Sequence, residues 1–119
     1  MDIKTTNLEL LKTISFLKKK SSETGSAVWR DLADRLRKPK HRRYAVNISR
    51  INRNSKTREK IIVPGKVLGS GKMDHPVHVA AFSFSGKATK KIVDAGGKCF
   101  SIPEFVSKNP KGSNLKIIV

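Results

Sequence analysis

The chain has 119 residues and a single cysteine, and its 26 Lys and Arg residues outnumber 9 Asp and Glu residues, for a formal net charge of +17. This length fits one domain, and the apolar runs are far shorter than the roughly 20 residues that span a bilayer. A single cysteine excludes an internal disulfide, and the high positive charge indicates a polyanionic binding partner.

Two kinds of polyanion fit this charge, a membrane surface and a nucleic acid. A membrane surface would favour a basic amphipathic helix or a lipidation motif, and the sequence shows no convincing case of either. A nucleic acid is therefore the expected partner. The lone Cys99 favours a reducing, cytoplasmic location.

Positive charge is concentrated in residues 35–60. This stretch holds eleven Lys and Arg residues against one acidic residue, Glu59. All of the arginines lie between Arg30 and Arg58, and the planar guanidinium group suits phosphate and stacked bases better than the point charge of lysine does. We therefore expect the main nucleic-acid contact in this stretch.

Two helices are predicted in the first third of the chain. Thr6-Asn7-Leu8-Glu9 reads as a capping box that begins the first helix. Apolar residues then recur at helical spacing as far as Leu17, and the helix is expected to end near Lys18–Lys20, where cations suit its C-terminal dipole. The second helix is predicted over Ala27–Arg37, with its apolar residues on one face.

The basic stretch itself is predicted to be mostly irregular. Residues 38–44 read as a connector. Apolar and polar residues alternate over Val46–Ile51, which predicts a strand with one wet face. Residues 53–60 read as a polar, basic loop.

Short strands alternate with helices in the remainder of the chain. Val77–Phe84 is apolar along most of its length, which predicts a strand covered on both faces. Ser85 is expected to cap a helix over residues 87–95 that Gly96-Gly97 ends, and Pro103 to begin a short helix over residues 103–107. Further strands are predicted over residues 60–63, 66–68, 99–102 and 115–119.

This order of elements favours the α/β class with a small sheet, preceded by two helices and a basic connector. We expect a single domain over residues 1–119. Within it, residues 1–37 form a helical region, residues 38–60 a nucleic-acid-contacting segment and residues 61–119 the α/β core.

The sequence shows no convincing pattern of a catalytic or cofactor site. The glycine-rich stretch of residues 65–72 fails the P-loop spacing, because Lys66 stands where the first glycine belongs and Met73 where Ser or Thr would hold magnesium. His75 and His78 lack further metal ligands, and Cys99 is more often a small buried residue than a nucleophile in such a strand. No Ser-His-Asp set or carboxylate pair is evident, so we expect no metal, no cofactor and no enzymatic activity.

The candidate binding residues are the cations of the basic stretch, the polar residues among them, and two lysines beside the glycines. Cations supply phosphate contacts, and Asn and Ser add hydrogen bonds to phosphate, sugar or base edges. Tyr44 could stack on an unpaired base, although a core role at a strand edge is equally plausible. The full set is Arg35, Arg37, Lys38, Lys40, Arg42, Arg43, Tyr44, Asn47, Ser49, Arg50, Asn52, Arg53, Lys56, Arg58, Lys60, Lys66 and Lys72.

The sequence resembles the L-eighteen-e family of large-subunit ribosomal proteins, which are related to the bacterial L-fifteen family. The resemblance is carried by Val46-Asn47-Ile48-Ser49-Arg50-Ile51-Asn52 and Val63-Pro64-Gly65-Lys66-Val67-Leu68-Gly69-Ser70-Gly71, in this order and spacing. Arg42-Arg43, the run Val79–Ser85 and Gly96-Gly97 support it, and it covers nearly the whole chain. The short C-terminal end is similar to the archaeal form.

This resemblance implies a fold of irregular β-β-α turns and a basic region laid on large-subunit ribosomal RNA. It also implies a structural role without catalysis, in the ribosome and hence in the cytoplasm, among neighbouring large-subunit proteins. Composition alone implies only a basic α/β domain that binds nucleic acid. A free-standing nucleic-acid-binding regulator is the alternative that composition leaves open.

Overall fold

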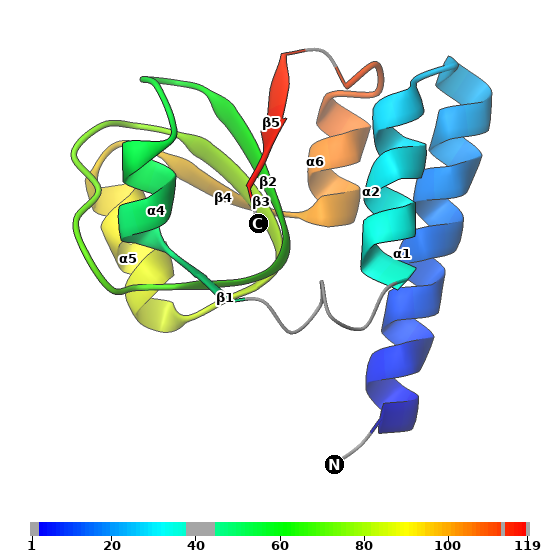
Figure 1. The fold of residues 1–119 in the computed structure, drawn as a ribbon, viewed down its shortest axis with the longest axis horizontal. Coiled ribbons are helices and arrows are strands. Elements are labelled where there is room, and N and C mark those ends of the chain that lie inside the picture. The colour runs from blue at the N-terminus through cyan, green and yellow to red at the C-terminus, as the bar shows by residue number, and fades with distance from the viewer. Residues whose placement is uncertain (1–2, 38–44, 113, 119) are drawn as a thin grey trace.

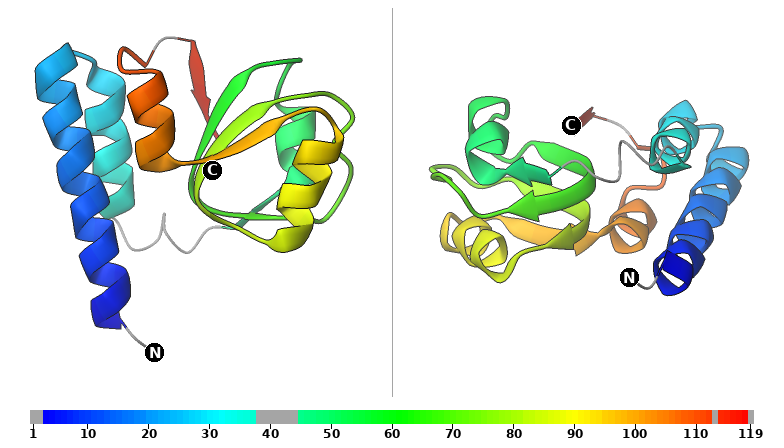
Figure 2. Two further views of the ribbon diagram at one scale, coloured as in Figure 1. Left: turned by 180° about the vertical axis from the view of Figure 1, so that it is seen from behind. Right: turned by 60° about the horizontal axis from the view of Figure 1, so that its bottom comes forward.

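The computed structural model describes residues 3–37, 45–112 and 114–118, which form three layers (Figure 1). Helices α1, α2 and α6 cover one face of a parallel sheet, and helices α4 and α5 cover the other, as the turned views also show (Figure 2). The helices are α1 (Ile3–Thr24), α2 (Ala27–Arg37), α4 (Ile48–Arg53), α5 (Gly86–Asp94) and α6 (Ile102–Lys108). The strands are β1 (Ala45–Asn47), β2 (Lys60–Leu68), β3 (His78–Phe84), β4 (Lys98–Ser101) and β5 (Leu115–Ile117).

Strand β2 is shared by two short strands on one of its edges. The order is β1-β2-β3-β4. Strand β5 pairs with Lys60–Ile62 and β1 pairs with Lys66–Leu68, both in parallel. The pairing of β2 with β3 shifts register between Val63 and Lys66, where Pro64 offers no N–H to the ladder. The sequence predicted two short strands here, and this was wrong because the Pro-Gly step forms an irregularity within one strand.

The direction of the crossovers decides which helix covers which face. The connection from β3 through α5 to β4 steps outward along the sheet, and the connection from β4 through α6 to β5 returns across it. Parallel crossovers are almost always right-handed, so a reversal of direction places the helix on the opposite face. Helix α6 therefore lies in the same layer as α1 and α2, with which it shares one core, and not with α5 (Figure 1).

Alternation along the central strands fills two cores. Ile62 and Ala80 face α1, α2 and α6, together with the buried Trp29. Their chain neighbours Ile61 and Val79 face α4 and α5. Successive side chains of a strand point to opposite faces, so a sheet covered on both sides needs continuous apolar runs. The prediction that Val77–Phe84 is covered on both faces is confirmed in β3.

Both predicted N-terminal helices are present, but the first is longer than predicted. Helix α2 has the predicted bounds. Helix α1 begins at Ile3, so Thr6 is not its cap, and it runs past the lysines to Thr24. Its end is set by Gly25, whose positive φ of 74° closes the helix while its N–H donates to Ser21. No helix in the described ranges combines the length and the apolar character needed to cross a membrane.

The largest error of prediction lies at residues 48–51. The strand predicted over Val46–Ile51 ends at Asn47, and helix α4 begins at the next residue. Ile48 and Ile51 are both fully buried against the sheet. A spacing of three is helical, but Val46 and Ile48 alone mimic the alternation of a strand.

The C-terminal half follows the prediction closely. Ser85 caps α5 by accepting from the N–H of Ala88, and Gly96 lies beyond its end with φ of 88°. Ser101 ends β4 and caps α6, so Ile102 belongs to the helix and not to the predicted strand. The predicted α/β class with a small sheet is confirmed, and the described strand pairs are all parallel.

Candidate nucleic-acid interface

Helix α4 turns two arginines to the solvent. Its apolar residues Ile48 and Ile51 are buried against the sheet, and this orientation leaves Arg50 and Arg53 exposed on the outer side. Asn54 caps the C-terminal end of the helix, and its backbone N–H donates to the carbonyls of Arg50 and Ile51 at 3.2 Å. The burial of the isoleucines therefore fixes the direction of the arginines.

The turn that follows α4, residues 54–59, is tightly hydrogen-bonded. The N–H of Lys56 donates to Oε1 of Glu59 at 2.9 Å, and the N–H of Glu59 donates back to the carbonyl of Lys56 at 3.1 Å. Arg58 has a positive φ of 64°, and its N–H donates to the carbonyl of Pro76 at 2.6 Å. A left-handed conformation costs a residue with a side chain about 1 kcal/mol. The hydrogen bonds of the turn therefore hold Arg58 in a backbone conformation that arginine does not favour.

The loop of residues 72–77 is tied to this turn by a chain of three side chains. Oγ of Ser55 lies 2.9 Å from Nε2 of His75, and Nδ1 of His75 lies 2.8 Å from Oδ1 of Asp74. The backbone N–H of Asp74 donates to Oδ1 of Asn52 on α4 at 3.1 Å. The hydrogen bonds from His75 and then Asn52 lower the pKa of the Asp74 carboxyl. These contacts join α4, the turn and the loop into one surface.

A serine, a histidine and an aspartate in a row invite comparison with a catalytic triad. This arrangement was not predicted, because Ser55 and His75 are 20 residues apart in the sequence. The Asp74 side chain is 73% exposed, whereas a triad aspartate is buried and thereby stabilises the histidine cation. The His75 side chain is only 15% exposed. We interpret these three hydrogen-bonded side chains as a structural link between the turn of residues 54–59 and the loop of residues 72–77.

A second loop, residues 69–71, is fixed near the other end of α4. The N–H of Ser70 donates to Oδ1 of Asn47 at 3.3 Å, and the N–H of Ser49 donates to the carbonyl of Ser70 at 3.2 Å. Nζ of Lys91 donates to the carbonyls of Gly69 and Gly71, both at 2.8 Å. The loop is therefore rigidly placed, and the exposed Lys72 follows it.

Three polar residues predicted to contact RNA serve the fold in this structure. Asn47 and Asn52 accept hydrogen bonds from backbone N–H groups of the two loops, through Oδ1 in each case. The β-carbon of Ser49 occupies the space into which a side chain at Gly71 would project, and Gly71 has φ of 102°. The oxygen of each asparagine side chain is thus engaged within the protein, and Ser49 packs against a loop.

The predicted cations separate into two groups. Those of the first group are paired within the protein or face away from α4. Arg35 and Arg37 form ion pairs with Asp31 and Asp34 on α2. Nζ of Lys60 donates to Asn109 at 2.7 Å. Lys66 precedes Val67, which packs toward α4 and α5, so Lys66 faces away from α4.

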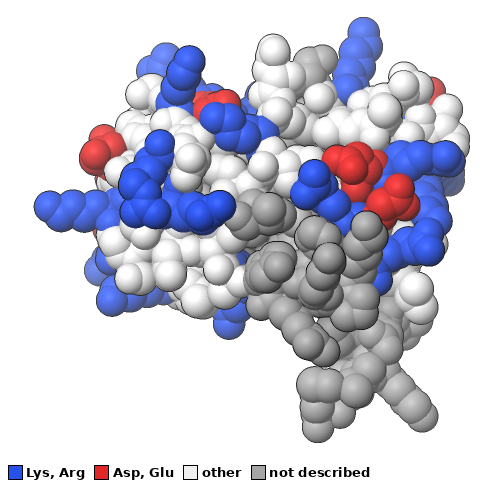
Figure 3. Space-filling model, viewed as in Figure 1, with Lys and Arg blue, Asp and Glu red and all other residues white. Residues whose placement is uncertain are grey.

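The other group surrounds α4. Its five members are exposed, and none has an ion pair or side-chain hydrogen bond among the described residues; we call them the cationic face: Arg50, Arg53, Lys56, Arg58 and Lys72. Basic side chains clearly outnumber acidic ones on the α4 side of the molecule, at the left of Figure 3. The predicted residues Lys38, Lys40, Arg42, Arg43 and Tyr44 lie outside the described part of the chain.

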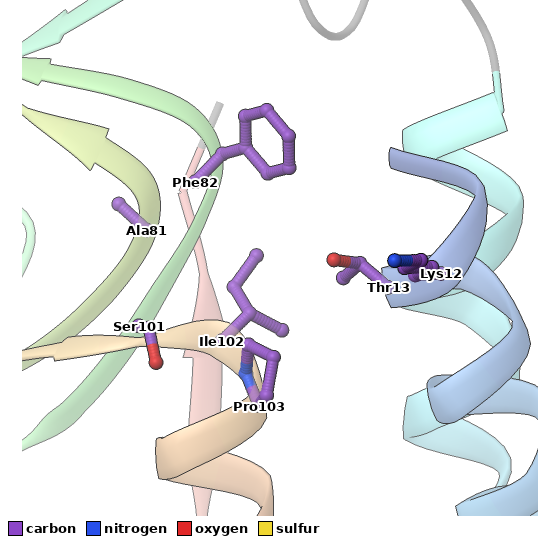
Figure 4. A pocket seen from close by; sticks show the side chains of 7 residues that line it. All are labelled: Lys12, Thr13, Ala81, Phe82, Ser101, Ile102 and Pro103. Carbon is purple, nitrogen blue, oxygen red and sulfur yellow. The ribbon is translucent and has the colours of Figure 1, made fainter. Parts of the chain in front are cut away.

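Two clefts are large enough to admit a small molecule. One of about 300 Å³ lies between α1 and the carboxyl ends of β3 and β4, with Phe82, Ile102 and Pro103 on one side and Lys12 and Thr13 on the other (Figure 4). None of its described lining residues is a carboxylate, a histidine or a cysteine. Another of about 320 Å³ lies between the loop of Lys72 and the end of α5. The described residues that line these two clefts do not include a nucleophile paired with a base.

The remaining titratable candidates are dispersed. Burial, and then the charges of Lys98 and Lys60, lower the pKa of His78, whose ring packs against Phe100 at a centroid distance of 6.1 Å. Burial raises the pKa of the half-buried Cys99 thiol, which keeps it protonated. Within the described ranges, no group of three His, Cys, Asp or Glu side chains is placed to hold a metal ion.

A comparison with protein families places the chain in a known family. The profile of the family described as "Ribosomal protein 60S L18 and 50S L18e" matches residues 3–119. The chain belongs to the L18e family. The resemblance stated from the sequence is thus confirmed over nearly the whole chain.

Curated relatives in the L18e family are similar along their full length. The "Large ribosomal subunit protein eL18" of Methanothermobacter thermautotrophicus is 53% identical, over 95% of this chain and 93% of the relative. The proteins of the same name from Archaeoglobus fulgidus and Methanoregula boonei are 45% and 46% identical, over 95% and 98% of this chain and 97% and 96% of the relatives. These archaeal relatives are ribosomal proteins and not enzymes, in agreement with the expectation from the sequence.

Proposed function

We propose that this chain is a structural constituent of the large ribosomal subunit that binds large-subunit ribosomal RNA through the cationic face. The assignment of RNA binding to this face rests on one observation. The five cations of α4 and its two adjoining loops are exposed and lack intramolecular partners among the described residues, whereas the two arginines of α2 are paired with aspartates.

Electrostatics explains why such a face needs an external anion. Like charges carried on a short helix and its loops repel one another in the free protein, and each long side chain stays hydrated and mobile. RNA phosphates remove this repulsion and accept charge-assisted hydrogen bonds, which arginine can make in pairs. In return, the protein neutralises phosphates where RNA segments pack together, so that the folded RNA does not repel itself.

The described polar residues support this face from beneath. Asn47 and Asn52 hold the two loops in place, so their proposed role in RNA binding becomes indirect. Residues 38–44 extend the proposed interface on the strength of their sequence, with four further Lys and Arg residues and Tyr44. We place the protein in the cytoplasm, within the ribosome, as one domain with RNA and neighbouring large-subunit proteins as its partners and without a cofactor or a small-molecule substrate.

A charge-matched pair of variants tests the proposal. The first changes four cations of the face, Arg50, Arg53, Lys56 and Arg58, to Gln. The control changes four exposed cations elsewhere to Gln, namely Lys19, Arg30, Lys98 and Lys111. Both lose four positive charges, so any difference between them reports position and not net charge.

We expect the first variant to melt at or slightly above the temperature of the unchanged protein, because relief of repulsion among surface charges is worth little to folding. It should fail to enter reconstituted large subunits, whereas the control should enter them. Equal incorporation of both variants would show that the RNA-binding face lies elsewhere. Unfolding of the first variant alone would make the cluster a structural one.

A free-standing nucleic-acid regulator is separated from a ribosomal constituent by sedimentation. A stable constituent stays with the large subunit through a high-salt sucrose cushion. A loosely bound protein is left in the supernatant, and that result would contradict the proposal.

A further inference from the structure

Arg58 occupies a backbone conformation that glycine would adopt at less cost. Its φ of 64° lies in the left-handed region, where the β-carbon of an L-residue crowds the backbone. The conformation is imposed from outside the residue. Its N–H donates to the carbonyl of Pro76 at 2.6 Å, and the next residue, Glu59, accepts through its carbonyl from the N–H of His78 at 3.0 Å.

The loop that imposes this conformation is itself fixed. His75 stands between Ser55 of the turn and Asp74 of the loop, with hydrogen bonds of 2.9 and 2.8 Å. Asn52 accepts from the N–H of Asp74. The position of the Arg58 backbone is therefore determined before any ligand arrives, which reduces the loss of conformational freedom on binding.

The Arg58 side chain takes no part in the hydrogen bonds described above that fix the turn and the loop. It is exposed, and no side-chain hydrogen bond or ion pair joins it to another described residue. The acid next to it in the chain is already engaged on both oxygens. Oε1 of Glu59 accepts from the N–H of Lys56, and Oε2 lies 3.6 Å from Nζ of Lys116.

We infer that the turn of residues 54–59 is a preformed phosphate-binding element, in which Arg58 is held in a left-handed conformation so that its guanidinium meets an RNA phosphate. The inference rests on the proposed function and specifies one contact within it. The side chain is kept at this position for binding, since the fold would be served as well by Asn or Gly. Arg58 contacts the ligand, and His75 is a positioning residue.

The test compares single variants of the full chain in binding a transcript of large-subunit ribosomal RNA. Arg58→Asn removes the charge, and asparagine tolerates the left-handed region better than most residues. We expect about tenfold weaker binding, a salt slope smaller by about 0.7 to 0.9, and a melting temperature at or above that of the unchanged protein.

Two controls separate conformation from charge. Asn114→Gly relaxes the other described left-handed residue that is not glycine, at φ of 59°, and leaves every cation in place. Arg30→Gln removes an exposed cation from α2, in the layer of helices on the opposite face of the sheet. Both should bind RNA within about twofold of the unchanged protein.

The outcomes distinguish this inference from the proposed function. If the unchanged protein binds with a steep salt dependence and Arg58→Asn binds within twofold of it, the inference fails and the proposed function stands. An equal loss in Arg30→Gln would also overturn it, because the attraction would then be diffuse. Arg58→Gly serves as the second variant, and unfolding of both variants would show that the fold needs the arginine, which contradicts the inference.

Discussion

Nε2 of His75 lies 2.9 Å from Oγ of Ser55, so one imidazole ring joins two loops that are 20 residues apart in the sequence. The other ring nitrogen is bonded to Asp74, and the ring is largely buried. Both ring nitrogens therefore have partners. The turn beneath the cationic face depends on this ring for its placement.

The link between these two side chains is testable as a double-mutant cycle. His75→Ala should lower the free energy of unfolding by about 1 to 2 kcal/mol, and Ser55→Ala by about 1 kcal/mol, since each removes a partly buried hydrogen bond. Because both changes remove the same bond, the double variant should lose less than the two losses added together. Urea unfolding of the four proteins measures this, and strict additivity would show that the two side chains do not interact.

A side chain would have room at Gly86 but not at Gly71. A β-carbon at Gly71, where φ is 102°, would overlap the side chain of Ser49. One at Gly86 would meet nothing within 4 Å. Gly71→Ala should therefore cost about 2 kcal/mol or more of stability, whereas Gly86→Ala, at the start of α5, should be neutral or stabilising. Thermal melting of both variants checks this, and equal melting temperatures would contradict the placement of the loop against α4.

The layer of N-terminal helices is anchored by Trp29. The ring is fully buried, and its Nε1 donates to the carbonyl of Pro110 at 2.7 Å. Trp29→Phe should cost about 2 kcal/mol, because it removes buried apolar volume and leaves that carbonyl without its donor. Val93→Ala, at a residue that is half exposed on α5, should cost under about 0.5 kcal/mol. Denaturant unfolding distinguishes the two, and a neutral Trp29→Phe would argue against tight packing of α2 on the sheet.

His78 predicts a contribution to acid sensitivity. Burial, and then the charges of Lys98 and Lys60, lower its pKa in the folded protein. The unfolded chain therefore takes up the proton first as the pH falls, so this stability is full above about pH 6.5 and is lost as the pH falls through that value toward the folded pKa. The melting temperature should fall less between about pH 7 and pH 5 in His78→Gln than in the unchanged protein. An identical fall in both would assign the sensitivity to other groups.

The class of fold and the C-terminal elements could be predicted from the sequence because their signals are local. Ser85 before a helical pattern and Gly96 after it mark the ends of α5 without reference to the rest of the chain. The apolar run of β3 reports burial on both faces in the same way. The family resemblance added the ribosome, which no local pattern indicates.

The errors arose where tertiary contacts decide between local alternatives. Val46 and Ile48 fit a strand of two-residue period, whereas Ile48 and Ile51 fit a helix entered after Asn47. The burial of Ile48 and Ile51 on one face of the sheet selects the helix. Within the basic stretch, composition treats all cations alike. In the structure, Arg35 pairs with Asp31 of its own helix, whereas the Arg50 side chain has no ion pair or hydrogen bond among the described residues.

The dependence of RNA affinity on salt tests the central claim most directly. Five phosphate contacts by the cationic face predict a slope of log affinity against log salt of about −3.5 or steeper for the unchanged protein on a large-subunit ribosomal RNA transcript. Changing Arg50, Arg53, Lys56 and Arg58 to Gln should reduce the magnitude of this slope by about 3, whereas the charge-matched control at Lys19, Arg30, Lys98 and Lys111 should keep it within about 1 of the unchanged value. Equal slopes for the two variants would contradict the assignment of the RNA contact to this face.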